Sequence, residues 1–205
     1  MPFTAWLGSI YVQRFAEGNR LFEFGHGVGS TAILFARYGF DLTLGDIAES
    51  YRRFAQHRFQ RRGLPARFVD LAKETPEPEA YDAVVSFDVI EHIPNPLPEI
   101  RKLWACLKPG GLMVLNIAFG CDPQNPEHVL HRRTGVLDRI RQMGFERIPT
   151  PFLLVYEKRD LGAKEKKLYR AQDFLDAMIA DMGPRWPRWV WPKRVRGGHA
   201  ASATA

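Results

Sequence analysis

Long hydrophobic runs and cysteine are both scarce in this chain of 205 residues. No stretch of about 18 apolar residues occurs, so the sequence predicts no membrane-spanning helix. The two cysteines, Cys106 and Cys121, lack the spacing of a metal site and fit a reducing compartment. Residues 1–15 also lack the basic and apolar segments of a signal peptide. We therefore expect a cytoplasmic protein that binds no metal.

Acidic residues are absent from the end of the chain. Residues 184–205 hold five Arg and Lys side chains and no Asp or Glu, so they contribute +5 to a net charge of +6. The remaining residues are nearly neutral, and a content of 45% hydrophobic and 25% charged residues is ordinary for a globular domain. We expect one main domain at 1–160, followed by a helix and a basic, Trp-rich tail at 161–205.

Short apolar segments alternate with longer helical patterns between residues 20 and 119. This alternation predicts parallel strands that are joined by crossover helices. Strands are expected at 20–24, 41–45, 66–70, 81–87 and 112–119, and helices at 28–38, 48–62 and 97–107.

After residue 119 the pattern changes. A helix is expected at 132–143, and two strands follow within 144–160. The link between these two strands is so short that only antiparallel pairing is possible. The sequence therefore predicts an α/β fold, namely a Rossmann-like, doubly wound, mostly parallel seven-stranded sheet with a reversed last strand and helices on both faces.

The segment LFEFGHGVGST connects the first expected strand to the first helix through three glycines at alternate positions. Glycine permits positive φ angles and close approach to the backbone, and the N–H groups at a helix start attract anions. A tight turn without a ligand would explain the glycines alone. Asp46 and Asp70 at the ends of the next two strands favour a ligand, because parallel sheets bind ligands beyond the carboxyl ends of their strands. An acid after the second strand can accept hydrogen bonds from both hydroxyls of a ribose.

Five stretches of the chain carry a family resemblance. They are LFEFGHGVG, LTLGDIAES, ARFVDLAKE, YDAVVSFDVIEHIPNP and LWACLKPGGLMVLNIAF. In this order they resemble the class I S-adenosylmethionine-dependent methyltransferases, over about residues 20–158. The VIEHIPNP segment is most similar to the small-molecule branch, which includes quinone-type O-methyltransferases. The resemblance implies S-adenosylmethionine as cofactor, a small-molecule acceptor methylated on O or N, and that family's seven-stranded sheet.

The resemblance also implies a set of cofactor-binding positions. These are Glu23, Gly25, His26, Gly27, Asp46, Ile47, Asp70, Leu71 and Phe87. At the amino-acid end, Gly25 and Gly27 would bring the backbone against the methionine part, and Phe87 would border it. Glu23 would orient the glycine loop and reach the cofactor's amino group. His26 replaces a small residue or Cys, and its neutral ring would point to solvent or into the acceptor pocket.

At the adenosine end, the resemblance assigns four of these positions. Asp46 would hold the ribose hydroxyls, and Ile47 would pack on the adenine. Asp70 would accept a hydrogen bond from the adenine amino group, while Leu71 would offer its backbone N–H.

Three histidines are candidates for a base that removes a proton from the acceptor. His92 follows the fourth strand, and His128 and His131 follow the fifth, where relatives often line the acceptor site. Because a hydroxyl or amine acceptor must lose a proton, an imidazole is suited to this role. Each histidine could instead only hydrogen-bond a loop.

Other functions have less support in the sequence. A nicotinamide dehydrogenase would show G-x-G-x-x-G, but the third glycine falls one place early at Gly29, with Ser30 in the expected slot. Base-methylating relatives usually carry an N/D-P-P-Y/F motif where FDVIEH stands here, and the basic segment at 52–62 is expected to be a solvated face. A protein or nucleic-acid acceptor, and cofactor binding without turnover, remain as alternatives.

The C-terminal segment has a composition of its own. Apolar residues at helical spacing predict an amphipathic helix at 163–182, and WPRWVWPKRVR then holds three of the five tryptophans. We expect an aromatic strap that packs on the chain's own surface or on a second subunit of a homodimer. Contact of this basic tail with nucleic acid or an anionic membrane is the less favoured alternative.

Overall fold

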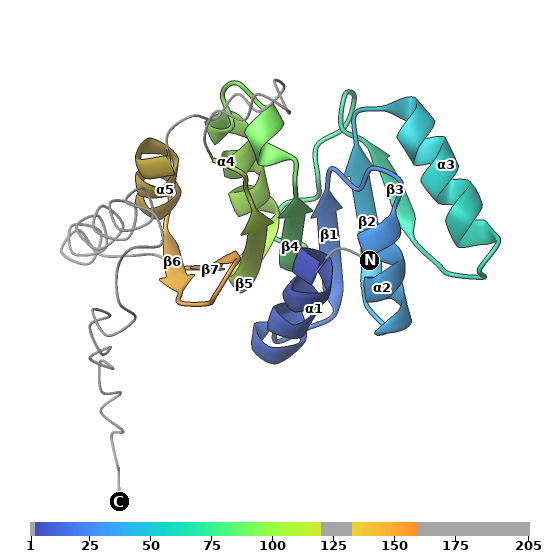
Figure 1. The fold of residues 1–205 in the computed structure, drawn as a ribbon, viewed down its shortest axis with the longest axis horizontal. Coiled ribbons are helices and arrows are strands. Elements are labelled where there is room, and N and C mark those ends of the chain that lie inside the picture. Colours follow the sequence, from blue (N-terminus) through green and yellow to red (C-terminus); the bar gives the residue numbers. More distant parts are fainter. Residues whose placement is uncertain (1–2, 120–132, 160–205) are drawn as a thin grey trace, which may run out of the picture.

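The structure is a computed structural model, and it describes residues 3–119 and 133–159. Its centre is a seven-stranded sheet in the order β3-β2-β1-β4-β5-β7-β6 (Figure 1). The strands are β1 (Arg20–Phe24), β2 (Asp41–Asp46), β3 (Arg67–Asp70), β4 (Tyr81–Phe87), β5 (Leu107–Asn116), β6 (Phe145–Ile148) and β7 (Leu154–Lys158). The helices are α1 (Phe3–Phe15), α2 (Ser30–Arg37), α3 (Glu49–Gln60), the short 3-10 helix η1 (Ile90–His92), α4 (Leu97–Cys106) and α5 (Arg133–Gln142).

The direction of the strands confirms the predicted topology. Strands β1 to β5 pair in parallel, whereas β7 runs antiparallel to both β5 and β6. The last strand of the sequence is therefore the reversed one, as the short link before it required. The crossovers between parallel strands carry the helices that cover the sheet.

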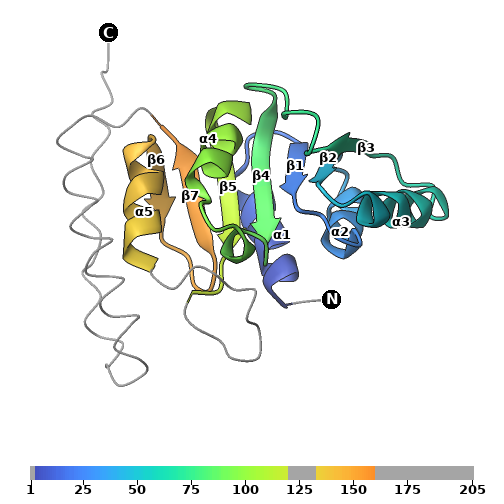
Figure 2. The ribbon, with the colours of Figure 1, turned by 90° about the horizontal axis from the view of Figure 1, so that it is seen from above.

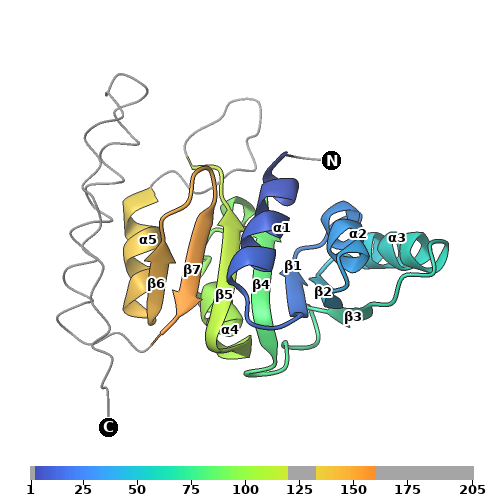
Figure 3. The same cartoon turned by 90° about the horizontal axis from the view of Figure 1, so that it is seen from below.

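Helices cover both faces of the sheet, as predicted. Figures 2 and 3 show α4 on the opposite side from α1 and α2. The strand β4 explains why both faces need a cover, because Val84 belongs to the core under α4 and α5 while Ala83 and Val85 belong to the core under α1, α2 and α3. The apolar run at 83–85 is typical of a parallel strand that is buried on both faces.

Helix α1 was not predicted from the sequence. Its residues are apolar nearly all round, so they lack the contrast between two faces that marks a surface helix. The buried residues of α1 include the small Ala5, Gly8 and Ser9, and a Cβ added at Gly8 would lie only 2.5 Å from Cζ of Phe87. The glycine therefore lets α1 approach the carboxyl end of β4. The Tyr11 hydroxyl donates a hydrogen bond to the Pro151 carbonyl at 3.0 Å, which also ties α1 to the β6–β7 turn.

Some expectations lie outside the described residues. These are the helix at 163–182, the Trp-rich tail with its homodimer, membrane or nucleic-acid contacts, and the histidines His128 and His131. Among the helices that the structure does describe, none combines the length and the apolar character needed to cross a membrane.

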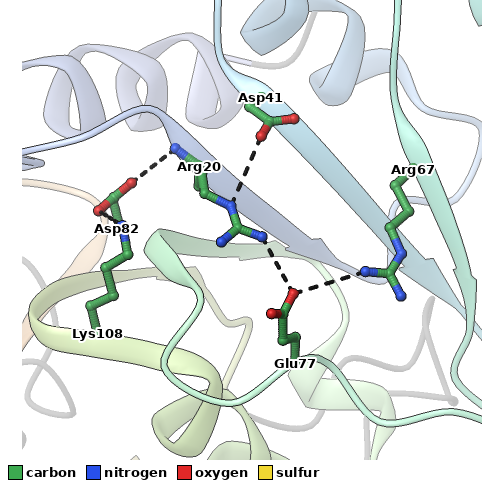
Figure 4. A network of polar contacts seen from close by, with 6 residues as sticks. All are labelled: Arg20, Asp41, Arg67, Glu77, Asp82 and Lys108. Atoms are coloured by element: carbon green, nitrogen blue, oxygen red, sulfur yellow. Dashed lines mark hydrogen bonds and ion pairs between the residues drawn. The ribbon is translucent and has the colours of Figure 1, made fainter.

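Charged side chains link the strand starts at the amino edge of the sheet (Figure 4). Asp82 accepts a hydrogen bond from the Arg20 backbone N–H at 3.0 Å and another from Lys108 Nζ at 2.7 Å. Glu77 lies 3.4 Å from Arg20 Nη2, and the contact between Arg20 Nε and Asp41 is longer, at 3.9 Å. This network therefore joins β1, β2, β4 and β5. It lies at the edge of the sheet opposite to the strand ends that carry Asp46 and Asp70.

We expect Asp82→Ala to lower the free energy of unfolding by about 1–3 kcal/mol, because it leaves the Arg20 N–H without its acceptor in a partly buried place. Urea unfolding would measure this loss. Asp41→Ala is the matched control, since its contact is long and its side chain is 70% exposed, and we expect a change below about 0.5 kcal/mol. Equal losses in the two variants would contradict this account of the network.

Candidate active site

The carboxyl ends of the parallel strands bring the predicted site residues to one edge of the sheet. Phe24 of β1 pairs with Gly45 of β2, and Asp46 pairs with Asp70 of β3. Strand β4 lies on the other side of β1 and ends at Phe87. The loops that follow these four strands are therefore neighbours, which is the usual position of a ligand site in such a sheet.

The glycine loop after β1 uses its glycines in two different ways. Gly25 has a φ of +75°, and a Cβ added there would lie 2.5 Å from a methyl carbon of Val89. Gly27 has a φ of +50°, and apart from its chain neighbours no atom of the described residues lies within 4 Å of a Cβ added there. The missing side chain of Gly25 makes room for Val89, and its contact with a cofactor stays a prediction. Gly27 is the position where the backbone borders open space.

Asp46 fixes the glycine loop to the start of α3. Its Oδ2 accepts a hydrogen bond from the Gly27 N–H at 2.9 Å, and its Oδ1 accepts one from the Ala48 N–H at 2.8 Å. The residue is only 6% exposed. Each oxygen keeps a second lone pair, so two ligand hydroxyls can still donate to this carboxylate.

Glu23 lies buried beside this acid and was expected to orient the glycine loop. In the structure, the hydrogen bond that holds the glycine loop runs from the Gly27 N–H to Asp46. Within the described residues, Glu23 Oε2 has no hydrogen-bond partner. Burial, with the negative charge of Asp46 as a second cause, raises the pKa of Glu23 to about 8. Glu23 is therefore protonated at neutral pH, and a nearby cation would favour its ionised form.

His26 does not point to solvent, which corrects one of the two orientations expected from the sequence. Its side chain is buried, and its ring packs edge-on against Phe68 of β3 at a centroid distance of 5.7 Å. Nδ1 lies 2.8 Å from the Gly27 carbonyl, and because a carbonyl only accepts, Nδ1 carries the hydrogen. Burial lowers the pKa of His26, so the ring is neutral and supports the loop through this hydrogen bond.

The end of β3 is held by contacts within the protein. The Leu71 N–H was expected to face an adenine, but it donates to the Asp46 carbonyl at 3.1 Å and extends the β2–β3 pairing. Asp70 Oδ1 accepts from the Ala72 N–H at 3.1 Å, and Oδ2 accepts from Arg52 Nη2 at 2.7 Å. Burial would raise the pKa of Asp70, but the hydrogen bonds and the charges of Arg52 and Lys73 together lower it. Asp70 is thus an ionised acceptor at this edge.

Two apolar side chains flank the acids. Ile47 directly follows Asp46 and is 73% exposed, so its side chain is available to pack on a flat ligand. Phe87 is half-buried at the end of β4 and is held against α1 at Gly8. Helix α1 therefore takes part in shaping the site's surroundings, which the sequence did not reveal.

The loops after β4 and β5 are joined to each other. Glu91 is fully buried, and its Oε1 accepts a hydrogen bond from the Ala118 N–H at 3.1 Å. Asn116 Nδ2 donates to Asp88 Oδ1, and Asp88 has a φ of 54°, which is unusual for a residue other than glycine. His92 ends the short helix η1 in this loop and is exposed. The described ranges contain no group of three or more potential metal ligands.

A comparison with protein families agrees with this geometry. A family model described as a methyltransferase domain matches residues 9–162 of the chain. The chain belongs to this methyltransferase family. The fold is also found in solved structures that this chain resembles. A protein of Pyrococcus horikoshii is 21% identical with a TM-score of 0.60, over 75% of this chain and 88% of that one. A SAM-dependent methyltransferase of Methanosarcina mazei is 17% identical with a TM-score of 0.58, over 73% and 97%.

Curated relatives share part of the sequence of this chain. The ubiquinone biosynthesis O-methyltransferase of Paramagnetospirillum magneticum is 34% identical over 102 residues, which are 48% of this chain and 40% of that protein. The protein of the same name from Xanthomonas campestris is 32% identical over 104 residues, or 48% and 43%. The aligned part of the chain thus spans less than half the length of these relatives.

Proposed function

We propose that the chain transfers a methyl group from S-adenosylmethionine to a small-molecule acceptor, on oxygen or nitrogen. The observation that carries this proposal is the arrangement of Asp46 and Gly27. One buried carboxylate holds a glycine loop whose backbone borders open space, at the carboxyl edge of a parallel sheet. Membership of the methyltransferase family supports the same function.

The residues present fit the parts of this cofactor. The ribose hydroxyls are donors, and the Asp46 oxygens have lone pairs left to accept from them. The exposed Ile47 suits the face of the adenine, and ionised Asp70 suits its amino group. The ammonium of the methionine part is a cation, which suits the buried Glu23 because Oε2 has no partner in the described parts of the chain.

The cofactor supplies an activated methyl group, so the protein's task is alignment and exclusion of water. The joined loops after β4 and β5 are suited to hold the acceptor, since Glu91 fixes one against the other. His92 lies in the first of these loops and is our candidate for the group that takes the acceptor's proton. His128 and His131 are the other candidates, and they lie outside the described residues.

The acceptor is proposed from the relatives. They are named as O-methyltransferases of ubiquinone biosynthesis, so a hydroxyl on a quinol-like or phenolic small molecule is the first choice. Acceptors in proteins or nucleic acids, and binding without turnover, are less favoured, and they are outcomes of the test.

Calorimetry with S-adenosylmethionine, S-adenosylhomocysteine and NADH tests the cofactor. We expect micromolar binding of the first two and none of NADH. Transfer of labelled methyl groups to a panel of catechols and substituted phenols then tests the acceptor, with total RNA and protein as comparison acceptors. Binding without transfer to any acceptor would contradict the proposed reaction, and absence of binding would contradict the cofactor.

The affinity for S-adenosylmethionine should rise with pH between about 6 and 7.5, by up to about tenfold per pH unit. Glu23 is protonated in the free protein at these pH values, because its pKa is about 8, and the bound ammonium favours its ionised form. Binding therefore releases a proton from Glu23. Calorimetry in buffers of different ionisation enthalpy measures this release.

Glu23→Gln should bind the cofactor more weakly, with little dependence on pH, and Glu49→Gln at the start of α3 should behave like the parent.

The raised pKa of Glu23 also affects the stability of the fold. The unfolded state ionises Glu23 near its ordinary pKa of 4.5, whereas the folded state does so only near 8. The stability of the free parent should thus fall across this window, and Glu23→Gln should not show that fall. A pH-independent parent affinity would contradict the proton release.

A further inference from the structure

We propose that Arg52 is a positioning residue that makes the cofactor site selective for adenine, by holding Asp70 as a fixed hydrogen-bond acceptor. This inference rests on the proposed function and concerns the same site. It assigns a role to one member of the basic segment at 52–62, which the sequence suggested to be a solvated face.

Arg52 is set apart from its neighbours by burial and by its contacts. Its side chain is 12% exposed, whereas the adjacent Arg53 is exposed. One guanidinium nitrogen, Nη1, donates to the Asp46 carbonyl at 2.9 Å. The other, Nη2, donates to Asp70 Oδ2 at 2.7 Å. One side chain from α3 thus ties together the ends of β2 and β3, at the last residue pair of their ladder.

The two contacts require the geometry of an arginine. A planar guanidinium presents two donors at a fixed separation, so it can reach a carbonyl and a carboxylate at the same time. A lysine has one ammonium and cannot hold both groups in this way. Lys73 also lies 3.4 Å from Asp70 Oδ2, but its side chain is 80% exposed, so it fixes the carboxylate much less.

The Asp70 carboxylate is held on both oxygens. Arg52 holds Oδ2, and the Ala72 N–H holds Oδ1 at 3.1 Å. Rotation of the carboxylate would break both hydrogen bonds, so the remaining lone pairs have a fixed direction. The side chain is 16% exposed, so these lone pairs are not fully enclosed by the protein.

A carboxylate fixed in this way can distinguish between purines. An ionised carboxylate accepts hydrogen bonds and cannot donate them. It matches the amino group of adenine, which donates, and opposes the carbonyl oxygen that hypoxanthine carries at the same ring position. Without Arg52 the carboxylate would lose the hydrogen bond that fixes Oδ2 and would be held mainly at Oδ1, so its direction would be less well defined and discrimination should fall.

Binding of S-adenosylhomocysteine and of its hypoxanthine analogue, S-inosylhomocysteine, measures this selectivity. We expect the parent to prefer the adenine ligand by roughly 10-fold to 100-fold, the range for one charge-assisted hydrogen bond. Arg52→Leu should reduce the preference to about threefold or less, mainly by weakening the adenine ligand. Arg52→Lys should give an intermediate preference. Arg53→Leu, the matched control on the same helix, should keep the parent's preference.

The results of these binding measurements distinguish a role of Arg52 in purine selectivity from a role in supporting the fold alone. Equal weakening of both ligands in Arg52→Leu would overturn the inference, because it would show a purely structural role. An unchanged preference in Arg52→Leu and Arg52→Lys would overturn it as well. If Arg52→Leu does not fold, as thermal unfolding would reveal, Arg52→Lys and Asp70→Asn decide, and both must lose preference. A parent that binds neither ligand would defeat the proposed function itself, whereas a parent that binds both equally would defeat only the role of Arg52.

Discussion

Gly27→Val should reduce the affinity for S-adenosylmethionine by more than about 100-fold, the largest effect that we expect on cofactor binding. The backbone of Gly27 has a φ of +50°, and within the part of the chain that the structure describes only its chain neighbours have atoms within 4 Å of a Cβ added there. A branched side chain would therefore enter the space that we assign to the cofactor. It would also strain the hydrogen bond from the Gly27 N–H to Asp46, because a left-handed residue other than glycine costs about 1–2 kcal/mol. Calorimetry measures the loss.

A second glycine separates the effect of space from that of backbone strain. Gly63, just after α3, has a φ of +61° and equally open surroundings. Gly63→Val should therefore lose a similar amount of stability in a urea titration but keep the parent's cofactor affinity. Asp46→Ala should give a smaller loss of affinity than Gly27→Val, about 1.5–3 kcal/mol, since it removes charge-assisted hydrogen bonds without filling space. Parent-like binding in both site variants would refute the proposed cofactor site.

His92→Ala should lower the rate of methyl transfer to a hydroxyl acceptor by about 100-fold to 10,000-fold, the usual contribution of a general base. His92 is exposed at the carboxyl edge of the sheet, in the loop that Glu91 fixes against the loop after β5. The proposed contacts with the cofactor lie mainly at the ends of β1, β2 and β3, so the affinity for the cofactor should stay near the parent value. Initial rates with labelled cofactor, together with calorimetry, measure both quantities.

His57→Ala is the control for this experiment, because His57 is an exposed histidine on α3 and should change neither quantity. A loss of less than tenfold in His92→Ala would assign the proton to another group, with His128 and His131 as the next variants. An equal loss of cofactor affinity would instead make His92 a support of the cofactor site.

The fold could be predicted because its strands are marked by composition alone. The apolar sequence of β4 requires burial on both faces, and the short link before β7 excludes a parallel crossover. Asp46 could be located in the same way, since it ends the second strand next to a glycine turn. These features depend on residues that are close in sequence and on rules that hold for any parallel sheet.

The contacts between distant segments could not be predicted. Helix α1 has no polar face, so its pattern gave no signal, and its approach to Phe87 depends on the single missing Cβ of Gly8. The sequence suggested that Glu23 would hold the glycine loop. In the structure, the pairing of β1 with β2 places Asp46 beside the loop, and Asp46 accepts the hydrogen bond from the Gly27 N–H. The Leu71 N–H was assigned to a ligand, although the pairing of β3 with β2 uses it.

The hydrogen bonds of the glycine loop have a consequence for the thermodynamics of binding. The N–H groups of Gly25 and His26 both point to the Gly45 carbonyl, at 2.8 and 3.3 Å, and the Gly27 N–H is held by Asp46. The loop is thus preorganised, and an arriving ligand does not have to order it. Because binding does not have to order this loop, that part of the entropic cost of association is absent, and more of the free energy of the ligand's contacts appears as affinity. Recognition at this loop should therefore resemble docking onto a rigid surface, with the same backbone before and after binding.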